Sequence, residues 1–215
     1  MSAARSILTA WLFLVWGSKA KIGFNIRIST AACWNYVVLQ VQIKNQLVLK
    51  TIDMKLVSED IINDLVDALD NLTDEQYEAK MEAFSEAQPV IFAWLFSEQF
   101  DLLTEDEKGF MQYLALIIWC AVDKVGGKSV QPVSEDQIGE AEERNYEVLE
   151  QSTEQRFRER LDVFFEDTPQ EELLAFAEEA VLEDEDDPSS IVTKEGREPI
   201  FVALKTMIDV LTVGE

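Results

Sequence analysis

Helix-start patterns recur along the chain after Met54, and they restrict this part of the chain to a helical fold. In each pattern a Ser or Thr residue precedes a turn rich in Asp and Glu, and apolar residues then return every three or four positions. Residues 73–76 and 104–107 have the spacing of a capping box, in which two side chains satisfy free backbone N–H groups. No comparable strand pattern follows Met54, so we expect an all-α domain over residues 54–215.

Apolar spacing predicts about eight amphipathic helices in this domain. The expected ranges are 58–72, 73–88, 90–96, 104–125, 134–149, 153–165, a seventh from 168 and an eighth that carries 200–211. Thr153 is expected to begin the sixth helix, and Thr168 the seventh, with Pro169 at its first helical position. Residues 90–96 are apolar on nearly every side, which predicts a helix in the middle of the core.

The two halves of this helical domain resemble each other. At an offset of 80 residues Thr73 aligns with Thr153, and further on residues 113–116 align with 201–204 at an offset of 88. This pattern indicates two tandem four-helix units, residues 54–127 and 134–213, around a pseudo-twofold axis. The alternative is a single eight-helix domain, because capped amphipathic helices of similar length align in this way generally.

The charge of the chain limits its partners. The sequence holds 42 Asp and Glu residues against 18 Lys and Arg residues, a formal net charge of −24. From Met54 onward there are 41 acidic and 12 basic residues, so direct binding to nucleic acid or to an anionic membrane is disfavoured. The sequence also has no His, which excludes imidazole-based catalytic triads, His-containing metal sites and His-ligated haem.

The first 53 residues differ in character from the rest. Residues 1–52 contain six basic residues and no acidic residue, and Asp53 is the first acid. Three interpretations stay open: a misassigned start with translation from Met54, a secretory signal with apolar residues 7–17, or a β-rich extension. We expect a cytoplasmic protein, with export as the alternative if residues 1–20 are a signal peptide. The apolar stretch has about eleven residues, which is too short to span a membrane.

Carboxylates are the abundant reactive groups, so an enzyme would have to use them. Glu140, Glu143 and Glu147 share one face of their helix, and Glu178 and Glu179 lie in the seventh helix. Mg²⁺ prefers oxygen ligands, which makes these five residues the candidate metal ligands. The shared face points away from the apolar stripe, however, so we expect a solvated surface there.

Cysteine usage indicates no metal centre or disulfide framework. The chain has two cysteines, Cys33 and Cys120, too few for a four-ligand metal site or for a set of stabilising bridges. Cys120 lies within the apolar run of residues 114–122, so we expect a buried and unreactive thiol.

The sequence thus predicts an acidic helical protein without catalytic residues or cofactor, which acts through contacts with a basic protein partner. One alternative is a Mg²⁺-dependent hydrolase that resembles nucleotide pyrophosphohydrolases in its use of helix carboxylates. A second alternative is that the acidic surface reflects a high-salt environment, where screening reduces the repulsion between like charges.

Overall fold

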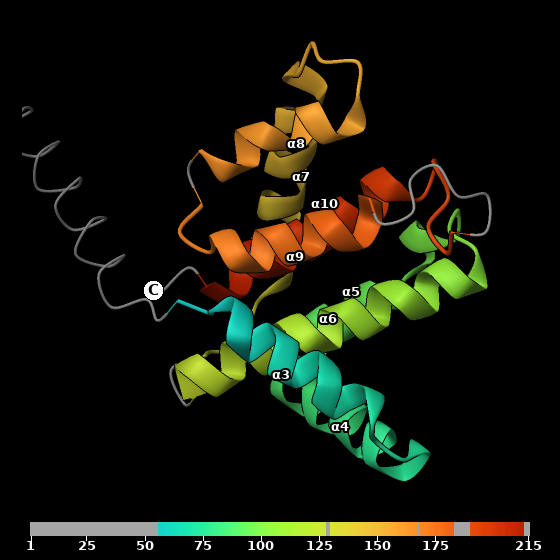
Figure 1. The fold of residues 1–215 in the computed structure, drawn as a ribbon, viewed down its shortest axis with the longest axis vertical. Helices are drawn as coiled ribbons and strands as arrows, with labels where there is room; N and C mark the ends of the chain where they lie inside the picture. The colour runs from blue at the N-terminus through green and yellow to red at the C-terminus, as the bar shows by residue number, and fades with distance from the viewer. Residues whose placement is uncertain (1–55, 128–129, 167, 183–189, 213–215) are drawn as a thin grey trace, which may run out of the picture. The chain divides into compact units, whose positions relative to one another are not determined.

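The helical part of the chain contains eight α-helices, in agreement with the expected all-α fold. The computed structural model describes residues 56–127, 130–166, 168–182 and 190–212, and the regular structure in these ranges is helical throughout. The expectations for residues 1–53 lie outside the described residues. The helices, shown in Figure 1, are α3 (Glu59–Asp70), α4 (Asp74–Ala87), α5 (Pro89–Leu95), α6 (Glu105–Gly126), α7 (Glu135–Gln151), α8 (Phe157–Phe165), α9 (Glu171–Leu182) and α10 (Arg197–Thr212), with one 3-10 turn, η1 (Glu98–Phe100).

Three helices begin with the side-chain caps that the sequence predicts. Thr73, Thr104 and Ser134 each accept a hydrogen bond from the backbone N–H three residues later, and each N-cap N–H donates back to the Gln or Glu at that position. Ser58 stands at the N-cap of α3 without a side-chain cap hydrogen bond. Local capping therefore determines where α4, α6 and α7 start.

Two expected helix starts are wrong, one by four residues and the other by two. α8 begins at Phe157 instead of Thr153, and α9 begins at Glu171 instead of Pro169. The hydroxyl groups just before these helices accept from the N–H two residues later: Glu154 donates to Ser152, and Gln170 donates to Thr168. This short turn competes with a helical cap, so the helix starts only after it.

The expectation that residues 90–96 form a helix in the middle of the core is also wrong. α5 has only seven residues, of which Ile91 and Leu95 are buried. Phe96, directly after the helix, is 50% exposed. The apolar side chains of this region thus lie on two faces. Ile91 and Leu95, four residues apart, face the core, and other apolar side chains are in contact with solvent.

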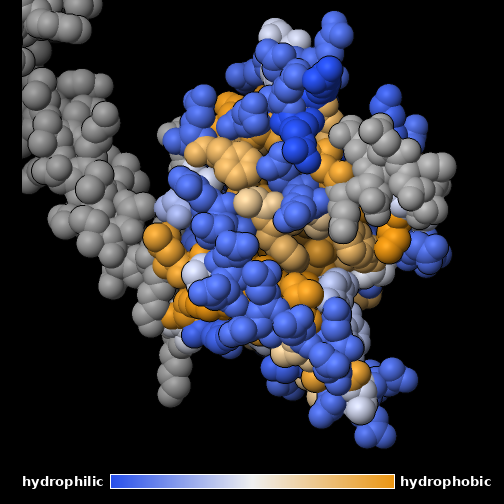
Figure 2. Space-filling model, viewed as in Figure 1, coloured by the Kyte–Doolittle hydropathy of each residue, from blue (hydrophilic) through white to orange (hydrophobic). Residues whose placement is uncertain are grey.

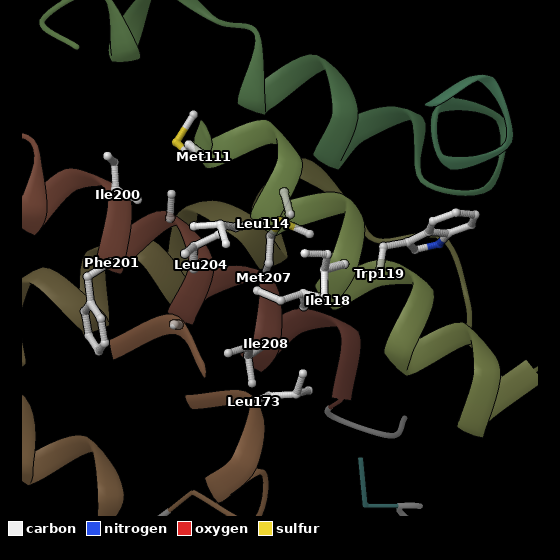
Figure 3. Close-up of a cluster of buried hydrophobic side chains, with 14 of the residues drawn as sticks. Met111, Leu114, Ile118, Trp119, Leu173, Ile200, Phe201, Leu204, Met207 and Ile208 are labelled. Atoms are coloured by element: carbon white, nitrogen blue, oxygen red, sulfur yellow. The ribbon is translucent and has the colours of Figure 1, made fainter. Parts of the chain in front are cut away.

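The core is centred on α6 and α10. Half of α6 is buried, and so is most of α10. α3 and α4 pack on α6, whereas α7 and α9 pack on α10. Figure 3 shows Leu114 and Ile118 of α6 and Leu204 and Met207 of α10 gathered between the two central helices. The other helices surround this apolar contact and present their charged faces outward.

The importance of the central contact can be tested with Ile118→Ala. The side chain of Ile118 is fully buried, so we expect its truncation to lower the free energy of unfolding by about 2–5 kcal/mol in urea denaturation. Leu102→Ala serves as the control, because Leu102 is 97% exposed and should change the free energy by less than about 0.5 kcal/mol. Equal effects of the two substitutions would contradict this arrangement of the core.

Candidate functional site

The candidate metal ligands do not form one site. Glu140, Glu143 and Glu147 are exposed on α7, and Glu178 and Glu179 lie on α9, where Glu179 is exposed and Glu178 is half-buried. Within residues 56–127, 130–166, 168–182 and 190–212 there is no group of three or more Asp, Glu, Cys or His side chains that could hold a metal ion. The three α7 carboxylates thus lie on a solvated face.

Glu178 has a structural partner instead. Its carboxylate lies 3.9 Å from the guanidinium of Arg158 in α8. Burial raises the pKa of Glu178, and the charge of Arg158 partly opposes this rise. The ion pair therefore joins α8 to α9, which pack on each other.

The described surface is strongly acidic. Figure 2 shows hydrophilic side chains over much of one face, with hydrophobic side chains gathered over its middle. The ion pairs that the structure forms are mostly exposed, such as Lys108 with Asp101 and Glu105, both at 3.3 Å. Exposed pairs of this kind add little stability, so the surplus of acidic side chains is available to a cationic partner.

The connection between α5 and α6 combines exposed apolar and acidic residues. We call residues 96–106 the connecting segment. It exposes Leu102 almost completely, at 97%, and Phe96 at 50%. The ring of Phe96 stacks on Phe92 with 4.6 Å between the ring centroids. The exposed acids of the segment are Glu98, Asp101, Glu105 and Asp106.

Buried residues hold the connecting segment in place. Phe100 and Leu103 are buried on either side of the exposed Leu102. Gln99 donates a hydrogen bond of 3.1 Å from its Nε2 to Oε1 of Glu142 in α7. Burial raises the pKa of Glu142, and the hydrogen bond from Gln99 opposes the rise. The connecting segment is thus held to the rest of the structure on both sides of Leu102. The sequence of α7 does not show that Glu142 binds Gln99.

A buried carboxylate joins α6 to the start of α10. Glu107 is 1% exposed, and its Oε1 accepts hydrogen bonds from the backbone N–H of Thr193 at 2.9 Å and from its hydroxyl at 2.7 Å. Its Oε2 accepts from the N–H of Thr104 at 2.8 Å. Burial raises the pKa of Glu107. The hydrogen bonds from Thr193 and Thr104 together lower the pKa by more than burial raises it, so the pKa lies below its ordinary value.

A second set of polar side chains lies between α7 and α10. We call Asn145, Lys205, Thr206 and Asp209 the polar network. Asn145 donates from Nδ2 to the hydroxyl of Thr206 at 3.2 Å and to Asp209 at 3.1 Å. Lys205 donates to the other oxygen of Asp209, and its ammonium group lies 5.5 Å from the centre of the Phe164 ring. Asn145, Lys205 and Thr206 are all buried. Each member has a partner, as a buried polar group requires.

Two further expectations concern Cys120 and the membrane. Cys120 is buried, as predicted, and burial raises the pKa of its thiol, which disfavours the reactive thiolate. α6 is long and apolar enough to cross a bilayer by length and composition. We call the part of the chain that carries α3 to α10 the helical body. In it α3, α4 and α10 pack on α6, so the apolar character of α6 is explained by its place in the core.

The Glu107 contact predicts a coupling between two positions. A Cβ atom at Gly196 would overlap with the Glu107 carboxylate, which Thr193 and Thr104 hold in place. We therefore expect Gly196→Ala to lower the free energy of unfolding by about 1–3 kcal/mol. In a Glu107→Ala background the same substitution should cost less by at least about 1 kcal/mol in urea denaturation. Additive effects would show that the carboxylate does not fill this space.

The same carboxylate predicts a pH dependence. Because its pKa is lower in the folded than in the unfolded protein, its contribution is fully present above about pH 4.5 and decreases as the pH falls through the folded-state pKa. The difference in unfolding free energy between the wild type and Glu107→Gln should thus be constant from about pH 5 to about pH 7 and shrink below that range. A difference that grows toward low pH would contradict the assignment.

Comparison with known proteins gives no relative for this chain. No protein-family model, no curated protein and no solved structure matches it. Its function therefore has to follow from its own surface and its own buried groups.

Proposed function

We propose that the helical body is a non-enzymatic binding protein that holds a basic protein partner at the connecting segment. The observation that carries this proposal is the exposure of Leu102 and Phe96 among four exposed carboxylates. An apolar side chain as exposed as Leu102 gains contact area only when another molecule covers it. Acidic residues around such a residue favour a partner whose own apolar residue is surrounded by Lys and Arg.

The two kinds of residue have different roles in such a contact. Burial of Leu102 and Phe96 against the partner supplies affinity, because the gain depends on the apolar area removed from water. The carboxylates steer the approach of a cationic surface and repel nucleic acid and other acidic proteins. A binding surface of this type discriminates by charge and holds by apolar contact.

The connecting segment is also prepared for binding. Phe100 and Leu103 anchor it to the core, and Gln99 ties it to α7. Lys108 contacts Asp101 and Glu105, one on each side of Leu102. Because the flanking residues are already held, a partner orders few additional side chains when it covers Leu102, which lowers the entropic cost of binding.

The proposal can be tested by affinity capture with the tagged full-length chain from an extract of its source cells. We expect the wild type to retain a basic protein at about 0.05 M KCl and to lose most of it at about 0.5 M KCl. The double variant Phe96→Ser/Leu102→Ser should retain it at least about ten-fold less, since removal of two apolar contacts weakens binding by more than about 1.4 kcal/mol.

The matched control is Leu56→Ser/Val163→Ser, which changes two exposed apolar residues outside the connecting segment. It should retain the partner as the wild type does. If the wild type and the Phe96→Ser/Leu102→Ser variant retained equal amounts of the basic protein, the proposal would be wrong. Circular dichroism over the same KCl range separates a binding role from adaptation to high salt, because a salt-adapted protein unfolds at the low end of the range.

A further inference from the structure

Two hydrogen bonds cross the helical body in the same manner. The backbone N–H of Val57 donates to Oε1 of Gln170 at 3.1 Å, and that of Val133 donates to Oε1 of Gln88 at 2.9 Å. Each Val belongs to a Val-Ser-Glu-Asp sequence that begins a helix, α3 in one case and α7 in the other. Each Gln directly precedes a helix, α5 in one case and α9 in the other. The start of α3 is thus bonded to the residue before α9 in the same way as the start of α7 is bonded to the residue before α5.

The packing of the helices follows the same correspondence. α3 packs on α6 as α7 packs on α10, and α3 contacts α9 as α5 contacts α7. α6 and α10, which correspond to each other, lie against each other at the centre. An exchange of α3–α6 for α7–α10 thus carries these contacts onto one another, as an approximate twofold axis between the two central helices requires. The packing departs from this exchange at two helices, because α4 packs on α6 and α9 packs on α10.

The central helices also correspond residue by residue. Thr104 accepts from the N–H of Glu107, and Thr193 accepts from the N–H of Gly196, again three residues later. Figure 3 shows Met111 and Ile118 along α6 in the same direction as their counterparts Ile200 and Met207 along α10. Glu107 and Gly196 are then equivalent positions, and they meet where the two helices approach each other. Close to such an axis there is space for only one of two side chains.

The two outer interfaces differ in chemistry. The hydrogen bonds of Thr104 and Thr193 correct the register of the central helices to an offset of 89, one residue more than the alignment of 113–116 with 201–204. With this register, and with Val57 matched to Val133, each member of the polar network has a counterpart in the first half. The counterparts of Asn145, Lys205, Thr206 and Asp209 are Leu69, Leu116, Ile117 and Cys120. All four counterparts are buried and apolar. The interface of α3 with α6 is apolar where that of α7 with α10 is polar.

Contacts of α3 with α6 support this register. Tyr113 donates to Asp70 at 2.6 Å, and Lys124 lies 3.9 Å from Asp64, so α3 runs antiparallel to α6. Leu69 is the residue before Asp70, so this antiparallel course places it opposite the part of α6 that follows Tyr113. In the second half, Asn145 likewise lies at the level of Thr206.

We propose that the helical body is a duplicated four-helix unit in which the polar network directs α7 to α10 instead of α6. A duplicated chain can pair its helices in two ways, because α3 and α7 can each pack on α6 or on α10. α6 is the nearer partner for α7 along the chain, since α6 ends at Gly126 and α7 begins at Glu135. A short connection favours antiparallel neighbours, so the local pairing is the main competitor.

The polar network makes the competing pairing unfavourable. Against α6, the amide of Asn145 would face Leu116, Ile117 and Cys120, none of which accepts a strong hydrogen bond. Lys205 and Asp209 would in turn face the apolar side of α3. The correct pairing satisfies every polar group, whereas the exchanged pairing removes Thr206 and Asp209 from the amide of Asn145 and buries the Lys205–Asp209 pair against an apolar surface. A single buried polar contact is known to select partner and register between packed helices in this way.

The test replaces the polar network with its counterparts in the full-length chain, as Asn145→Leu/Lys205→Leu/Thr206→Ile/Asp209→Ala. We expect this variant to remain helical by circular dichroism but to lose unique pairing. Helices that no longer select one partner can also pair between two chains, so after refolding from urea at about 100 μM protein the fraction of dimer by size-exclusion chromatography with light scattering should rise at least about five-fold over the wild type. A second set of amide resonances should also appear in a ¹H–¹⁵N correlation spectrum.

Two controls make the outcome decisive. Leu116→Ile/Ile117→Leu changes buried side chains at the corresponding place in α6 without altering polarity, and it should refold like the wild type. The double variant Asn145→Leu/Thr206→Ile keeps the contact of Lys205 with Asp209 and should show an intermediate dimer fraction. Refolding of the four-residue variant to one species with the wild-type dimer fraction would overturn the proposal, and so would loss of its helical structure.

Discussion

The packing of α6 against α10 is the contact on which the rest of the helical body depends. Both helices are buried along much of their length, and the other large contacts place α3 and α4 on α6 and α7 and α9 on α10. This central apolar pair allows the outer helices to carry acidic residues on most of their surface, because the outer helices need only one apolar face each. The high acidic charge of the chain is therefore compatible with a stable fold, because the apolar contact of α6 with α10 is buried at its centre.

An acidic surface of this extent repels itself, and three of the cations in the described ranges form ion pairs between helices, namely Lys124, Arg158 and Arg160. Arg160 contacts Glu198 at 2.9 Å and the carbonyl oxygen of Leu149, which joins α8 to α10 and α7. Lys108 similarly holds the residues around Leu102. Most of the remaining carboxylates are exposed to solvent.

Local interactions made part of this structure predictable. The capping boxes at Thr73 and Thr104 depend on residues three positions apart, so the sequence shows them directly, and the apolar run of residues 114–122 indicates that Cys120 is buried. The starts of α8 and α9 were missed because hydroxyl groups before them form a shorter turn. The roles of Asn145 and Glu107 were missed because their partners lie 61 and 86 residues away. Such distant contacts leave no periodic signal in the sequence.

The parallel course of α6 and α10 has an electrostatic consequence. Aligned peptide dipoles give the N-terminal end of every helix a partial positive charge, and two parallel helices bring these ends together. Glu107 lies in the first turn of α6 and accepts hydrogen bonds from Thr193, just before α10 begins. One carboxylate thus offsets the positive ends of both helices. The first turns also carry Glu105 and Asp106 in α6 and Glu198 in α10. Among these acids Glu107 is the buried one that bonds to both helix starts, and it stabilises a side-by-side arrangement that the dipoles alone would oppose.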